Sequence, residues 1–96
     1  MANRIEFTGR VTRTPELRVT PAGTPVLDFS VECAEPDEKL SLEVVMAGDA
    51  AREIATGLKR GAMVAVTGRL RAAASRAIGM AGIEVVASLI EVRAQA

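Results

Sequence analysis

Residues 3–31 read NRIEFTGRVTRTPELRVTPAGTPVLDFSV, and this stretch decides the fold. Apolar Ile5, Phe7 and Val11 share one parity, while charged and hydroxyl-bearing residues take the other. This alternation is the period of a strand with one buried face. A second run with the same period covers residues 26–33. The stretch therefore predicts two antiparallel strands, each with one buried and one wet face.

The segment between these two strands carries residues that interrupt a sheet. Pro15 cannot donate a backbone hydrogen bond to a ladder. Pro21, Ala22 and Gly23 combine a fixed φ with a residue that readily takes positive φ. We therefore expect a loop between the first two strands.

Three further alternating runs follow along the chain. They cover residues 40–46, 64–70 and 83–92, and the last run changes its apolar parity near Ala87 or Ser88. A parity change within a strand is typical of a β-bulge. The sequence thus predicts five strands, the fifth of them bulged.

A short helix is expected between strands 3 and 4. Asp49 is suited to its N-cap and Gly57 to the position after its C-cap. Gly68 permits the fourth strand to bend and close a small barrel. Residues 1–96 are therefore predicted to form one all-β domain, a five-stranded oligonucleotide/oligosaccharide-binding (OB) barrel. Such barrels bind ligands across their second and third strands and the adjoining loops.

Composition limits the possible functions. The 96 residues include no His, a single Cys and no Gly-rich phosphate loop, so we expect neither an enzyme nor a metal or cofactor site. Cys33 falls on the apolar parity of its strand, and we interpret it as a core residue. There is no apolar run of about 18 residues and no signal-peptide core, so we expect a cytoplasmic protein with no membrane partner.

The formal net charge is zero, but the charges are segregated along the chain. Residues 1–27 carry four basic and two acidic side chains, residues 28–50 one basic and seven acidic, and residues 51–96 seven basic and three acidic. Ten of the twelve basic residues are Arg, whose planar fork binds phosphate with two hydrogen bonds and stacks on bases. Six of them are our candidate contacts to nucleic acid: Arg10, Arg13, Arg18, Arg69, Arg71 and Arg76.

These arginines have an alternative interpretation as a solvated surface that binds nothing. For Arg10 and Arg13 both interpretations stay open. The functional one is favoured for four arginines that fall on or beside the loops lining the groove of this fold, namely Arg18, Arg69, Arg71 and Arg76. Arg71 and Arg76 also have no acidic residue near them in the sequence. We therefore expect their charges to be open to a ligand.

Several motifs match a known family in order and spacing. They are Gly9-Arg10, residues 13–18 (RTPELR), the turn at residues 20–23 (TPAG), Phe29-Ser30-Val31, and residues 54–70 (IATGLKRGAMVAVTGRL). The chain resembles the bacterial single-stranded-DNA-binding proteins over nearly its whole length. This resemblance implies an OB barrel with single-stranded DNA as its ligand.

Within that family, the chain is similar to one branch in particular. It stops at Ala96, directly after the last expected strand, without the long acidic-tipped tail that the family usually carries. In this it resembles the primosomal replication protein N branch. That resemblance implies a homodimer, with single-stranded DNA, the replication-restart helicase and the helicase loader as partners. The first strand is free to lie at a sheet edge, where a second copy could pair with it.

Aromatic residues are scarce. The chain has no Trp and no Tyr, and both Phe7 and Phe29 fall on the apolar parity of their strands. Stacking on aromatic side chains contributes roughly 1–3 kcal/mol per base in proteins of this kind. We therefore expect weak DNA binding that depends on Arg. The alternative is a protein-interaction adaptor that keeps the OB barrel and has little DNA affinity.

Overall fold

The computed structural model describes residues 3–35, 38–73 and 82–94. Strands dominate it, as the alternating sequence predicts. The elements in chain order are β1 (Ile5–Val11), β2 (Glu16–Val19), β3 (Pro25–Glu35), β4 (Glu38–Ala47), α1 (Asp49–Ala55), β5 (Met63–Ala73) and β6 (Gly82–Ala94).

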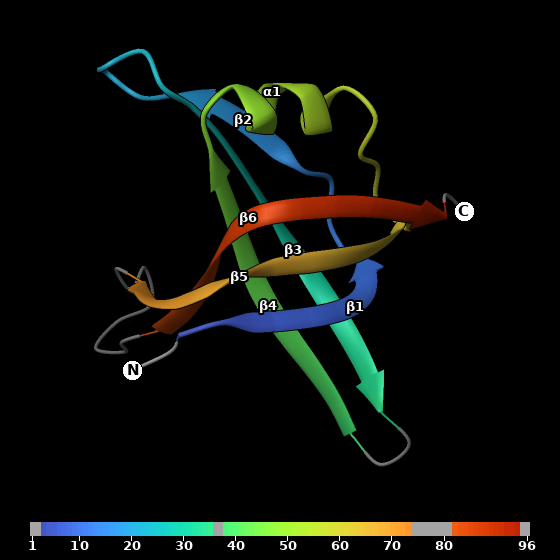
Figure 1. Cartoon of the computed structure of the whole chain (residues 1–96). Coiled ribbons are helices and arrows are strands. Elements are labelled where there is room, and N and C mark those ends of the chain that lie inside the picture. Colours follow the sequence, from blue (N-terminus) through green and yellow to red (C-terminus); the bar gives the residue numbers. More distant parts are fainter. Residues whose placement is uncertain (1–2, 36–37, 74–81, 95–96) are drawn as a thin grey trace.

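Five of the strands close into a barrel. The order in the sheet is β1-β5-β6-β4-β3-β2, and a further pairing of β1 with β3 joins the ends of the barrel. Only the β4–β6 pair is parallel among these described pairings. In Figure 1, the long β3–β4 hairpin runs steeply through the view and crosses β1, β5 and β6. The predicted OB barrel is confirmed, with its helix after the third barrel strand.

β2 is a strand where the sequence predicted a loop. It begins directly after Pro15 and pairs antiparallel with β3, from Glu16 opposite Asp28 to Val19 opposite Pro25. All four of its residues are exposed, so β2 adds to the outside of the barrel and buries no face. The alternation that reveals a half-buried strand is therefore missing here.

The core fills the inside of the barrel with aliphatic side chains and Phe29. Phe29 is fully buried, while Phe7 is half-buried and packs against the core cluster. Cys33 packs against the same cluster, as predicted. Both aromatic rings therefore belong to the interior, and no residue of the described ranges offers a free aromatic platform.

The start of helix α1 differs from the prediction. The N-cap of α1 is Gly48, with φ of +98°, and Asp49 is the first helical residue, so the prediction of an Asp49 cap is wrong. Gly57 does follow the C-cap Thr56, as predicted.

The predicted bulge in β6 is confirmed. Gly68 pairs with Ala87 and its neighbour Thr67 pairs with Leu89, so the register skips Ser88. Across the described ranges, no helix has the length and hydropathy needed to span a membrane.

Candidate nucleic-acid interface

The outer surface of the barrel is defined by residues that alternate with the core. Val44 of β4 and Val85 of β6 are fully buried. Their chain neighbours Glu43 and Glu84 consequently point outward, because successive side chains of a strand face opposite sides.

Strand register places polar side chains in a line across this outer surface. Ser30 of β3 pairs with Glu43 of β4, Glu43 with Glu84 of β6, and Glu84 with Arg71 of β5. Directly opposite residues share a face of the sheet, so these four side chains cross four strands together. We call Ser30, Glu43, Glu84 and Arg71 the outer row. It runs from the β3–β4 face, across which OB barrels bind their ligands, to β5 and β6, whose connection is one of the loops that contact those ligands.

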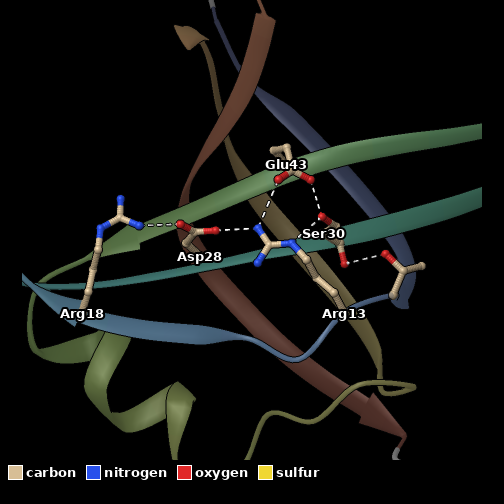
Figure 2. A network of polar contacts seen from close by, with 6 residues as sticks. Arg13, Arg18, Asp28, Ser30 and Glu43 are labelled. Carbon is tan, nitrogen blue, oxygen red and sulfur yellow. Dashed lines mark hydrogen bonds and ion pairs between the residues drawn. The ribbon is translucent and has the colours of Figure 1, made fainter. Parts of the chain in front are cut away.

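Arg13 reaches one end of the outer row from the segment after β1 (Figure 2). Its Nε donates to the Ser30 hydroxyl at 2.9 Å, and one terminal nitrogen lies 2.5 Å from an Asp28 oxygen and 3.1 Å from a Glu43 oxygen. The Ser30 hydroxyl in turn donates to the second oxygen of Glu43. Hydrogen bonding to Asp28 is the main cause that raises the pKa of the Arg13 guanidinium.

Asp28 joins Arg13 to Arg18. Arg18, on β2, donates to the second Asp28 oxygen at 2.6 Å, so each oxygen of this carboxylate accepts from a different arginine (Figure 2). The Asp28 side chain is only 13% exposed. Burial raises the pKa of this carboxyl, but the hydrogen bonds from Arg13 and Arg18 outweigh burial and leave the pKa below its ordinary value.

Arg71 closes the other end of the outer row. Its Nε donates to Glu84 at 2.8 Å, and a second guanidinium nitrogen contacts the same carboxylate oxygen. The prediction that Arg71 has no nearby acid is therefore wrong. Antiparallel pairing of β5 with β6 brings Glu84 opposite Arg71, although the two residues are 13 positions apart.

The remaining candidates differ in their surroundings. Arg69 pairs in register with Val86, is exposed, and has no ion pair within the described ranges. It lines an open depression of about 290 Å³ beside the bulge at Ser88. Arg10 lies opposite Glu32 in the β1–β3 pair and donates to the Gly61 carbonyl at 2.9 Å.

Arg76 lies outside the described residues. The structure thus brings Arg13 and Arg18 together at one end of the outer row and places Arg69 and Arg71 at the other end. Arg10 lies on β1, opposite Glu32 of β3.

Sequence reasoning missed the three carboxylates of this surface. Asp28, Glu43 and Glu84 bind Arg13, Arg18 and Arg71, so these six charges balance. The outward parity of the three acids was a usable signal in the sequence. Their partners lie 10 to 30 residues away, however, and are known only once the register is known.

Comparison with known proteins gives the family. The sequence model of the single-strand binding protein family matches residues 2–91. The chain belongs to this family. Single-stranded DNA-binding protein 3 of Listeria innocua is 35% identical over 78 residues, which cover 74% of this chain and 49% of that protein.

Other relatives are similarly close. The single-stranded DNA-binding protein of Oceanobacillus iheyensis is 35% identical over 74% of this chain and 48% of its own length. That of Mycobacterium tuberculosis is 36% identical over 70% of this chain and 48% of its own length. The chain therefore spans about half the length of the curated relatives it matches. Membership in this family agrees with the expectation of a binding protein and not an enzyme.

Proposed function

We propose that this chain binds single-stranded DNA along the outer row and holds the phosphate backbone with arginines. The observation that carries the proposal is the line of polar side chains from β3 to β5, with Arg13 and Arg18 at one end and Arg69 and Arg71 at the other. This line follows the surface on which OB barrels bind oligonucleotides. Arg10 and Arg76 are further proposed contacts, Arg76 on the strength of the sequence alone.

Binding should be electrostatic in origin. Guanidinium groups bind phosphate oxygens in pairs of charge-assisted hydrogen bonds. Within the described ranges Arg69 has no ion pair to give up, whereas Arg13, Arg18 and Arg71 each already bind a carboxylate that competes with phosphate. Since Phe7 and Phe29 belong to the interior, stacking on aromatic rings contributes little.

A titration with fluorescent oligo-dT at several salt concentrations tests this function. We expect weak binding whose log K falls with log salt at a slope near −0.7 for each phosphate contacted. A matched oligo-dA should give a similar slope, because the arginines contact the backbone. Affinity that does not change between low and high salt would contradict the proposal.

We further propose that the DNA-binding function serves replication restart, with the restart helicase and its loader as protein partners. The support is the resemblance of residues 9–31 and 54–70 to the single-stranded-DNA-binding proteins and the small barrel without aromatic platforms. A pull-down of purified restart helicase with the chain, with and without oligo-dT, tests this role. Helicase capture without any oligo-dT binding would favour the adaptor function instead, and no capture would argue against restart.

A further inference from the structure

Three arginines of the proposed DNA site are already bound by the protein itself. Asp28 accepts from Arg13 and Arg18 through separate oxygens, at 2.5 and 2.6 Å. Arg71 is held by Glu84 through two of its nitrogens. Arg13 and Arg71 thus have two guanidinium nitrogens engaged and Arg18 has one, so groups of the protein occupy part of the binding capacity that phosphate would need.

The middle of the outer row is acidic. Glu43 and Glu84 are partners in the parallel pairing of β4 with β6, so two carboxylates lie on neighbouring strands between the two groups of arginines. A phosphate backbone that runs from Arg13 to Arg71 must cross both of them. Each carboxylate repels phosphate and also holds an arginine that the phosphate needs.

Glu43 contributes little to the stability of the barrel. Glu43 has a side chain that is 56% exposed, and exposed ion pairs typically stabilise proteins only slightly. Like charges on adjacent strands are themselves unfavourable. The structural role of Glu43 is therefore small, and its main effect is on the charge of the surface. Glu84 is only 17% exposed and is held by two nitrogens of Arg71, so the thermal midpoint of each Glu84 variant is measured beside its DNA binding.

We propose that Asp28, Glu43 and Glu84 are affinity-determining residues that compete with DNA phosphate for the arginines of the outer row. This inference rests on the proposed single-stranded-DNA binding and names the groups that set its strength. With the three carboxylates charged, the outer row binds DNA weakly. Neutralising Asp28 releases Arg18, and neutralising Glu84 releases Arg71. Neutralising Glu43 removes a repulsion and one of the two carboxylates that hold Arg13.

The test replaces carboxylates by their neutral amides and measures oligo-dT binding by fluorescence anisotropy at low salt. Glu43→Gln and Glu84→Gln should each tighten binding several-fold, and the two together should tighten it further. The salt slope should steepen by about 0.7 for each phosphate gained. Asp28→Asn should act in the same direction through Arg13 and Arg18.

Glu53→Gln is the matched control. Glu53 lies on α1, is exposed, and makes no side-chain ion pair within the described ranges, so this substitution changes the net charge equally without releasing an arginine. A second control combines Glu84→Gln with Arg71→Ala. If Glu84 acts through Arg71, much of the gain from Glu84→Gln is lost in this background, while the gain from Glu43→Gln persists in it.

Each outcome decides between the claims. If the carboxylate variants bind oligo-dT no tighter than Glu53→Gln, or more weakly than wild type, the competitor role is wrong. The carboxylates would then serve to position the arginines. The DNA function would stand in that case, because wild type still binds. If the wild-type protein does not bind oligo-dT but the Glu43→Gln, Glu84→Gln double variant does, the competitor role is upheld and the proposed function is refuted. Binding by neither would refute both, provided that thermal midpoints show folded proteins.

Discussion

At the scale of single residues, Asp28 is the point where the two arginines at one end of the outer row meet. The sequence predicted Arg13 and Arg18 as candidates because they lie in the polar segment before β3. It could not predict that both bind one carboxylate, because Asp28 is 15 and 10 positions away from them. Parity placed Asp28 outward, but only the β2–β3 pairing brings Arg18 beside it.

The hydrogen bonds to Asp28 predict an acid dependence of stability. The pKa of Asp28 is lower in the folded protein, so its contribution is fully present above the ordinary pKa of about 3.8 and is lost as pH falls through the lower folded value. The unfolding free energy of Asp28→Asn should therefore decrease less than that of wild type between about pH 5 and about pH 2. At pH 7 the variant should be less stable than wild type by about 1 kcal/mol. Urea unfolding at a series of pH values measures both effects. The same acid profile in Asp28→Asn and in Glu53→Gln would contradict the assignment to Asp28.

At the scale of elements, alternation located the five barrel strands but not β2. Each barrel strand has one face in the core, whereas Glu16, Leu17, Arg18 and Val19 are all exposed. The prediction of the helix N-cap residue was wrong for a local reason. Gly48 takes the N-cap position with a positive φ that disfavours other residues, and Asp49 falls one position later. Both misses concern features that burial does not determine.

Close approach of β1 to β3 gives a prediction at this scale. A Cβ added to Gly9 would lie 2.5 Å from Val31 Cγ1 and 2.6 Å from the Glu32 carbonyl oxygen. The Glu32 backbone is held in the β1–β3 pair, so Gly9→Ala should force the strands apart and destabilise the protein by about 1–3 kcal/mol. Gly57→Ala is the control, because its Cβ would meet nothing within 4 Å and its φ is not positive. Equal thermal midpoints for the two variants would contradict this packing.

At the scale of the whole molecule, barrel closure decides which charges meet. The five-stranded barrel was predictable from the order of alternating runs and one helix. The outer row was not, because it depends on the parallel register of β4 with β6, which brings Glu43 beside a residue 41 positions later in the chain. Closure also explains why a sequence with segregated charges gives a surface on which arginines lie beside acids.

The β1 edge predicts a homodimer. β1 pairs with β5 from Ile5 to Arg10, but its pairing with β3 covers only Arg10 and Val11. Among the described residues, the first half of β1 therefore has a neighbouring strand on one side alone. An open edge of this kind can pair with the same edge of a second copy across a two-fold axis. A barrel of 96 residues buries only roughly 60–65% of its unfolded surface, so added burial in a dimer would stabilise it. Sedimentation at micromolar concentration should show a species of twice 10.1 kDa, and a 10.1 kDa species at every concentration would rule the homodimer out.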